Sequence, residues 1–425
     1  SQVMVPKDNY QVTINKGKGD DGPVFSDRTR ITIVFPDLEV NDSIFFKVKT
    51  FQKEPMFEDS FAISRYFWGQ RAYDDVQIRF DLPENLDFDY QVRKMEEKKE
   101  IKNGRQLITL HYQNPKPIKD DRKDFSVWDE SKEAGYAIST FKNYESLAKA
   151  YGKRATPKAV ATDRIRTLAK EIIGDEQDRK KQARLIYDWV TTNISYGGNC
   201  IGVGAVVPHD IDFILDNRMG DCKDHALLVQ SLLSTVGVES TQALINSGSI
   251  YNLPEIPRVS SVNHVINYIP EWDLFVDSTN SNLPFDHLAM SLSDKQVLLV
   301  DNFKENLRTP PSKPGANYQE LNSTMEIQPD GSVQGTIEIK TKGFPAVQLR
   351  SSWRHATKEQ EDEWLKNTFS SQHQLGSGVM EKDDPDPLLS EYNYSITFEK
   401  PEFILSSGAG AFYPGPMVST PMPIY

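Results

Sequence analysis

The chain has 425 residues, 38% of them hydrophobic and 26% charged, which is enough apolar material for ordinary packed cores in roughly two to four domains. Its formal net charge of −12 at pH 7 provides no overall positive field, which argues against nucleic acid as a partner. The sequence has no apolar run long enough to cross a bilayer, and no cysteine or histidine spacing typical of a structural zinc site. We therefore expect a globular protein without a membrane-spanning segment, and we assign it no metal and no cofactor.

Short runs of alternating apolar and polar residues occupy the first part of the chain. They lie at residues 30–35, 44–49, 76–80 and 107–112. Because side chains alternate across a strand, this pattern predicts antiparallel sheet with one face toward solvent. The charge-rich stretch 96–102 predicts a solvated hairpin. We interpret residues 1–148 as an N-terminal β domain of the sandwich type.

Helical periodicity replaces the alternating pattern after about residue 144. The apolar spacing predicts helices over residues 160–173, 176–193 and 222–236, and the glycines that follow the first and the third suit helix ends. Strand-like runs follow at 241–245, 262–269 and 272–276. This mixture predicts an α+β domain over residues 149–308.

The last part of the chain returns to a β pattern. A stretch rich in Pro, Lys, Asn and Gly at 302–318 is typical of a linker, and residues 323–340 predict a hairpin with its turn at 328–331. A further strand is expected at 394–398, and the Gly- and Pro-rich tail shows no periodicity. We therefore expect a C-terminal β domain over 309–425. The predicted fold class is an α+β core flanked by N-terminal and C-terminal β-sandwich-like domains.

Cys222 is the strongest candidate for chemistry, because a loop turns into a predicted helix at this residue. A cysteine in the first turn of a helix faces unpaired backbone N–H groups and the positive end of the helix dipole, and both favour the thiolate over the thiol. The same N–H groups are able to stabilise an oxyanion on a substrate. Gly220 would let a substrate backbone approach. Cys222 is therefore a candidate nucleophile, although helix-start cysteines also occur as plain core residues.

A thiolate nucleophile needs a base and a group that orients the base, and candidates for both follow Cys222 along the chain. His264 lies in the predicted strand 262–269, and Asp277 follows the predicted strand 272–276. A helix followed by neighbouring strands is able to bring the three side chains together. His264 would then pair with the Cys222 thiolate, while Asp277 would accept the second ring N–H of the imidazole.

The segments that carry these residues resemble the core of the transglutaminase-like superfamily, which shares the fold of papain-like cysteine proteases. The resemblance rests on the GDCKD segment 220–224, on Asn263 with His264, on segment 276–279 and on the helix-like segment 186–196. It covers roughly residues 150–305. The β region before it is similar to an uncharacterised β domain that often precedes such cores in bacterial secreted proteins.

This resemblance implies Cys222 as nucleophile, His264 as base and Asp277 as the group that orients the base. The implied chemistry is acyl transfer at an amide bond, most simply hydrolysis of a peptide or protein substrate. The implied location is outside the cytoplasm, either periplasmic or secreted. Two alternatives stay open, a protein-glutamine acyltransferase and a non-catalytic binding or scaffolding protein, because a fold does not define a substrate.

The resemblance also implies an oxyanion donor upstream of the cysteine. Tyr196 is ranked first for this role, ahead of Asn199 and Trp189, because Trp189 falls on the apolar stripe of its predicted helix. The backbone N–H of Cys222 is the second expected donor.

Other polar residues near Cys222 are given structural interpretations. His225 is expected at the surface or behind the site, and the first-turn charges are expected to be exposed: Asp221, Lys223 and Asp224. Cys200 is interpreted as a small apolar filler near the active-site loop. His209 is expected to stand apart from the nucleophile.

Overall fold

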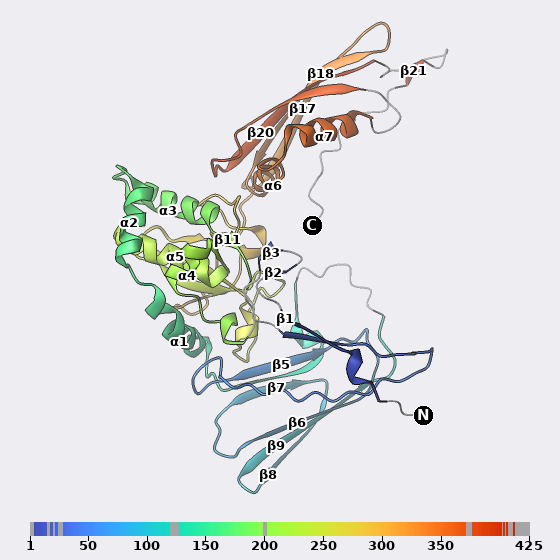
Figure 1. Ribbon diagram of the computed structural model, residues 1–425, viewed down its shortest axis with the longest axis vertical. Helices are drawn as coiled ribbons and strands as arrows, with labels where there is room; N and C mark the ends of the chain where they lie inside the picture. The colour runs from blue at the N-terminus through green and yellow to red at the C-terminus, as the bar shows by residue number, and fades with distance from the viewer. Residues whose placement is uncertain are drawn as a thin grey trace. The chain divides into compact units, whose positions relative to one another are not determined.

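A computed structural model describes residues 4–14, 18–19, 22–23, 29–119, 127–198, 202–370, 376–401, 403, 405–406 and 411–412. The chain divides into two compact units (Figure 1). The first consists of Ser1–Thr279 and Lys295–Thr309, and the second of Asn280–Asp294 and Pro310–Tyr425. The predicted boundaries at 148/149 and 308/309 remain predictions, because the first unit holds both the N-terminal sheets and the helical core.

Two three-stranded antiparallel sheets form the N-terminal part of the first unit. One has the order β5 (Ala62–Phe67), β10 (Ala134–Ser139), β7 (Asp89–Arg93), and the other β6 (Tyr73–Pro83), β9 (Arg105–Asn114), β8 (Glu96–Lys102). Phe67 and Ile138 from the first sheet pack with Ile108 and Leu110 from the second in one apolar cluster. This packing is sandwich-like, as the alternating pattern predicted. Residues 96–102, predicted as a solvated hairpin, are exposed throughout as expected but form the single strand β8.

A smaller pair, β1 (Tyr10–Ile14) and β4 (Thr29–Ile33), accounts for the run predicted at 30–35. The strand predicted at 44–49 is wrong, because the structure assigns no strand there and leaves Phe45 and Phe46 exposed. Its alternating residues suit a strand, but a strand also needs a partner to complete its hydrogen-bond ladder, and none is present for this segment among the described residues.

Helices surround one four-stranded sheet in the rest of the first unit. The helices are α1 (Tyr144–Ala155), α2 (Asp163–Ile173), α3 (Arg179–Asn193), α4 (Ile211–Asn217) and α5 (Cys222–Thr235). The sheet has the order β15 (Leu274–Val276), β14 (His264–Ile269), β13 (Thr241–Ile245), β16 (Val297–Leu299). Helix α5 contacts α2, α3, β13 and β14, so it is the central helix of this core (Figure 1). The three predicted helices and the three predicted strands are all present, with small shifts at their ends.

The strand register decides where the candidate residues lie. Strands β14 and β15 run antiparallel, with Asn267 opposite Val276. His264 is the first residue of β14, and Asp277 follows the last residue of β15, so both stand at the same end of the strand pair. The side chain of Asn267 also donates to the carbonyl of Ala226 at 2.9 Å, which ties β14 to the first turns of α5.

The main sheet of the second unit is antiparallel, with the order β17 (Tyr318–Ile327), β18 (Val333–Lys342), β20 (Glu391–Lys400), β19 (Ser377–Lys382), and a short pair, β21 (Leu405–Ser406) and β22 (Ala411–Phe412), follows it. The predicted hairpin is confirmed, because β17 and β18 pair across the turn at 328–331. Helices α6 (Phe344–Trp353) and α7 (Lys358–Ser370) were not predicted, and they lie along this sheet (Figure 1). Trp353 and Phe369 belong to the apolar cluster that joins these helices to the sheet. They take the place expected for a second sheet.

The predicted fold class is confirmed at the level of an α+β core with β-sheet domains before and after it in the chain. Within the described ranges, no helix has both the length and the apolar character needed to cross a membrane.

Candidate active site

Cys222 is the first residue of α5 and is half-buried. Asp221 precedes it in an extended conformation, and the backbone N–H of Asp221 donates to Asp224 Oδ2 at 3.0 Å. This contact from the residue before the helix to its first turn defines where α5 begins. The Cys222 side chain therefore lies at the positive end of the helix dipole.

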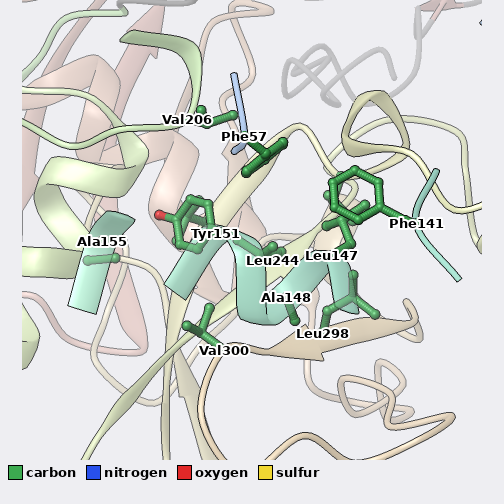
Figure 2. Close-up of a cluster of buried hydrophobic side chains, with 13 residues drawn as sticks. Phe57, Phe141, Leu147, Ala148, Tyr151, Ala155, Val206, Leu244, Leu298 and Val300 are labelled. Atoms are coloured by element: carbon green, nitrogen blue, oxygen red, sulfur yellow. The ribbon is translucent and has the colours of Figure 1, made fainter. Parts of the chain in front are cut away.

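Cys222 lies against a cluster of buried apolar side chains. Figure 2 shows this cluster, in which Tyr151 and Leu147 from α1 pack with Phe57, Leu244 and other buried side chains. Cys222 packs against the same cluster and keeps partial exposure.

His264 and Asp277 form a close pair beside this helix start. His264 Nε2 lies 2.8 Å from Asp277 Oδ2, and both side chains are mostly buried. The other carboxylate oxygen of Asp277 accepts the N–H of Thr279 at 3.0 Å and its hydroxyl at 2.7 Å. With Asp277 fastened by Thr279, the direction of the His264 ring is set as well.

The charge state of His264 follows from these neighbours. Burial alone lowers the pKa of His264, but the Asp277 charge and hydrogen bond, together with a hydrogen bond to Cys222, outweigh burial and raise this pKa to about 10. Burial raises the pKa of Asp277, but the His264 charge and the hydrogen bonds from His264 and Thr279 reverse that effect and lower it. At neutral pH the site therefore holds an imidazolium next to an ionised carboxylate.

The structure thus brings together the three residues that the sequence analysis singled out. Because Nε2 of His264 faces Asp277, Nδ1 is the ring nitrogen left for the Cys222 side chain. Such an arrangement is able to keep a thiolate charged, and also to deliver a proton to a leaving group beside it.

The first-turn charges differ from the prediction, since Asp221, Lys223 and Asp224 are all buried. Lys223 Nζ pairs with the Asp221 carboxylate. Charged groups are buried in this way only when each has a partner, and a sequence pattern without contacts does not show that partner. The prediction that these three side chains are exposed to solvent is therefore wrong.

His209 is also closer to the nucleophile's helix than predicted. Its backbone N–H donates to Asp224 Oδ1 at 2.7 Å, and its Nδ1 lies 2.9 Å from Asp224 Oδ2. The sequence carried no signal for this pair, because the two residues belong to different segments.

His225 is buried rather than at the surface, with Nδ1 3.5 Å from the hydroxyl of Ser278, and burial lowers its pKa.

A steric requirement, which was not predicted from the sequence, explains why position 220 is a glycine. A Cβ placed on Gly220 would lie 2.6 Å from the Cβ of Asp224, closer than side-chain atoms approach. A glycine is therefore required for the helix start to close on Asp224.

Tyr196 lies next to the same segment. It belongs to the short strand β11 (Ser195–Tyr196), which pairs in parallel with β12 (Met219–Gly220), so that Tyr196 stands opposite Gly220. Tyr196 is 52% exposed. Trp189 lies under the guanidinium of Arg218, at 5.0 Å from ring centroid to cation. Asn199 and Cys200 lie outside the described residues.

No group of three His, Cys, Asp or Glu side chains arranged to hold a metal ion occurs within the part of the chain that the structure describes.

The α+β core has a cysteine at the start of its central helix and a His–Asp pair at the ends of two neighbouring strands, the arrangement that the resemblance to papain-like folds led us to expect. Residues 166–245 match the model of the Transglutaminase-like superfamily, so this part of the chain is similar to the core of that superfamily. Residues 2–119 match a domain of unknown function, DUF3857. The first match contains Cys222 and ends before His264 and Asp277.

Two solved structures are similar to the chain. A "putative protease" from Parabacteroides distasonis ATCC 8503 is 11% identical with a TM-score of 0.57, covering 94% of this chain and 80% of that one, which shows a shared fold. A "putative cysteine protease" from Cytophaga hutchinsonii is 14% identical with a TM-score of 0.23, covering 52% of this chain and 74% of that one. A comparison with proteins of curated function gave no match.

Proposed function

We propose that the protein is a cysteine peptidase or amidohydrolase in which Cys222 is the nucleophile, His264 the base and Asp277 the group that orients His264. One observation carries this proposal: a mostly buried imidazole hydrogen-bonds Asp277 at 2.8 Å through Nε2 and also hydrogen-bonds Cys222. A histidine between a carboxylate and a helix-start cysteine has the partners that acyl transfer by a thiolate requires.

The first half of the reaction forms an acyl-enzyme. The Cys222 thiolate attacks the carbonyl carbon of an amide bond, and the carbonyl electrons move to oxygen. The resulting tetrahedral intermediate collapses, the carbon–nitrogen bond breaks, and the His264 imidazolium gives its Nδ1 proton to the departing nitrogen. The amine leaves, and the acyl group stays on sulfur as a thioester.

The second half returns the site to its starting state. Water attacks the thioester carbonyl while the now neutral His264 takes a proton from it. The carbon–sulfur bond breaks, the carboxylic acid product leaves, and the thiolate and the imidazolium are restored. Asp277 stabilises the imidazolium in both halves and keeps its own negative charge.

In both halves of the reaction, hydrogen-bond donors are needed to stabilise the negative charge that develops on the carbonyl oxygen. The N–H of Cys222 is one candidate, because the first N–H groups of a helix have no partners within the helix. The hydroxyl of Tyr196 is the second candidate, supported by the pairing of Tyr196 with Gly220 two residues before the nucleophile.

Alkylation tests the proposal directly. Iodoacetamide at mildly acidic pH should modify Cys222 far faster than Cys200, with the modified residue identified by peptide mass spectrometry. Equal slow reaction of both cysteines would instead support a binding or scaffolding protein. Cleavage of an unfolded protein substrate, assayed by release of new amino groups, then tests hydrolysis.

The choice between water and an amine as acceptor needs a separate experiment. We favour water, because it requires no second substrate. A glutamine-containing peptide is incubated with and without a primary amine. Product formation that rises with the amine, with incorporation of the amine into the peptide, would instead support a protein-glutamine acyltransferase.

We also propose that the protein acts outside the cytoplasm, on a peptide or a glycan-linked peptide, a proposal that rests on the superfamily resemblance. Fractionation of source cells with detection by an antibody tests the location, and recovery with the cytoplasmic fraction contradicts it.

A further inference from the structure

The loop at 246–263 leads directly into His264, because it connects β13 to β14. It is long and has little regular structure, and a long loop of this kind needs contacts that hold it in one conformation. At its base, Asn246 donates to the carbonyl of Ser261 at 3.0 Å, and the Ser247 N–H donates to Asn263 Oδ1 at 2.8 Å. These contacts close the loop next to His264 but do not fix its outer part.

The outer part of the loop is held by the N-terminal sheets through Arg258. This guanidinium is only 2% exposed, and its Nη2 donates to the Tyr66 hydroxyl at 2.6 Å and to the carboxylate of Glu130. Tyr66 lies on β5, and Glu130 begins a short 3₁₀ turn (Glu130–Lys132) just before β10. A buried arginine thus reaches from the loop into the N-terminal domain.

Glu130 is shared between two arginines. Its Oε1 lies 3.2 Å from Nη1 of Arg93 on β7, and its Oε2 accepts the Tyr66 hydroxyl at 3.1 Å as well as Arg258. The side chains of Arg93 and Glu130 are 9% and 15% exposed. Removing one member of such a network leaves its partners buried and incompletely paired, which lowers the free energy of unfolding. The network therefore favours one position of Arg258 strongly.

Three further contacts fasten the same loop to residues that precede the helical core or open it. Trp128 N–H donates to the carbonyl of Ser249 at 2.8 Å, Gln91 Nε2 donates to Glu255 at 3.0 Å, and the Tyr144 hydroxyl donates to the carbonyl of Pro254 at 2.8 Å. The loop is therefore attached to the N-terminal domain at several points, with Arg258 as a buried charged attachment to that domain. Lys295 of the core also donates to the carbonyls of Gly248 and Ile250 in the first part of the loop.

We infer that Arg258 is a positioning residue for His264, and that the N-terminal β domain serves as a brace that holds the His264-bearing loop in its catalytic conformation. This inference rests on the proposed function. Only a short 3₁₀ turn (Val259–Ser261) and two residues separate Arg258 from His264, so a shift of Arg258 is passed along the chain to the imidazole. A displacement of about 1 Å at a reacting group costs as much as roughly 100-fold in rate.

The test compares Glu130→Gln and Arg258→Gln with Arg258→Lys, which keeps the charge, and with Arg105→Gln as a matched control. Arg105 pairs with Asp81 at 2.7 Å, and its side-chain hydrogen bonds stay within the N-terminal sheets, away from the loop. For each variant one measures the rate of Cys222 alkylation by iodoacetamide from pH 5 to 9, and hydrogen exchange of the amides at 254–264.

The brace predicts at least a tenfold loss of alkylation rate near pH 6 in Glu130→Gln and Arg258→Gln, because a displaced His264 no longer keeps the thiolate charged. Arg258→Lys should recover part of that rate, Arg105→Gln should match the parent, and amide exchange at 254–264 should be faster in the two affected variants. Glu130→Gln preserves side-chain shape, so it provides the test if Arg258→Gln does not fold.

Two results would overturn the inference in distinguishable ways. If the parent reacts rapidly at pH 6 and folded Glu130→Gln and Arg258→Gln react equally rapidly with unchanged exchange, then the brace is wrong while the proposed function stands. If the parent itself reacts slowly at pH 6, then the proposed function is wrong, and the role of Arg258 as a positioning residue is rejected with it.

Discussion

Buried Asp224 pairs with partly exposed His209 at the start of the nucleophile's helix, with His209 Nδ1 at 2.9 Å from Asp224 Oδ2. The Asp224 carboxylate accepts two more donors, the backbone N–H groups of His209 at 2.7 Å and Asp221 at 3.0 Å. One fully buried carboxylate therefore joins the segment before α4 to the turn that presents Cys222. The position of the candidate nucleophile depends on a residue that does not itself react.

Replacing Asp224 by asparagine should destabilise the fold by about 2–4 kcal/mol, because an amide replaces a carboxylate that accepts three hydrogen bonds without exposure to water. Urea unfolding at pH 7 gives the free energy. Asp212→Asn is the matched control: Asp212 pairs with Arg164 on the surface at 3.1 Å, and its loss should change stability by less than about 1 kcal/mol. Equal losses in both variants would contradict the role given to Asp224.

Acid should reduce the difference between the parent and Asp224→Asn. Burial raises the pKa of Asp224, but the His209 hydrogen bond, the charges of Lys223 and His209, and the Asp221 N–H together lower it below 3.8. A carboxyl whose pKa is lowered on folding adds stability above its unfolded pKa and loses it as pH falls through the folded pKa. The deficit of the variant should therefore be full at pH 7 and shrink only below pH 3.8.

Substituting Gly220 by alanine should destabilise the protein by about 1–3 kcal/mol, because the new Cβ would meet the Asp224 Cβ at 2.6 Å. The displaced Asp224 should also disturb the start of α5, so Cys222 alkylation near pH 6 should slow. Gly198→Ala is the control, since a Cβ added there would meet no described atom within 4 Å and the backbone at Gly198 is not left-handed. A neutral Gly220→Ala would show that the turn adapts without cost.

The fold was predictable where the local sequence of a segment determines its secondary structure. Helix α2 ends at Ile173 before Gly174, whose φ of 52° suits glycine, and β13 spans the predicted residues 241–245. Helices α6 and α7 were missed, because packing against a sheet made of distant strands stabilises them. The strand predicted at 44–49 failed for the converse reason, since its pattern suits a strand but no partner completes it among the described residues.

The candidate site was predictable to a similar extent. The proximity of Cys222, His264 and Asp277 was predictable, because helix-start and strand-end positions are visible in the pattern and because the superfamily resemblance orders them, while their catalytic roles stay a proposal. The residues that hold the start of α5 through a buried contact were missed. Asp224 was expected in solvent, and His209 was expected to lie apart from the nucleophile. Burial of a charge depends on a partner from another segment, and neither periodicity nor composition records that pairing.

Cys222→Ala should abolish alkylation at this position and all amide hydrolysis, while changing stability by no more than about 1 kcal/mol, because the side chain is half-buried and only the sulfur is lost. Activity and thermal unfolding are measured on the same preparation. Cys222→Ser, which keeps a weaker nucleophile in place, should retain at most a trace of activity. A large drop in melting temperature together with an inactive parent would indicate that the cysteine only packs against the core.

Asp277→Asn should slow amide hydrolysis by roughly 100-fold or more, because the amide stabilises the His264 imidazolium poorly and allows the wrong tautomer. The pKa of His264 should fall from about 10 toward its ordinary value of 6.5. Nuclear magnetic resonance titration of the His264 ring measures this shift directly. Thr279→Val, which removes only the 2.7 Å hydroxyl donor to Asp277, should produce a smaller loss of the same kind.

The stability of Asp277→Asn should depend on pH in a defined direction. A histidine whose pKa is raised on folding adds stability that is complete below pH 6.5 and is lost as pH rises through about 10. The variant should therefore be most destabilised near pH 6 and approach the parent near pH 10. Urea unfolding at pH 6, 8 and 9.5 tests this, and a deficit that grows with pH would contradict the imidazolium–carboxylate pair.

Tyr196→Phe separates the oxyanion role from the state of the nucleophile. Loss of the hydroxyl should lower kcat for amide hydrolysis by roughly 10- to 100-fold, because one donor to the developing negative charge is removed. Alkylation of Cys222 by iodoacetamide passes through no carbonyl oxyanion, so its rate and pH dependence should stay at the parent values. The side chain is 52% exposed, so stability should also stay within about 0.5 kcal/mol. A variant with unchanged kcat would assign the oxyanion to backbone N–H groups without Tyr196, and equal loss of both rates would mean that Tyr196 acts on the thiolate.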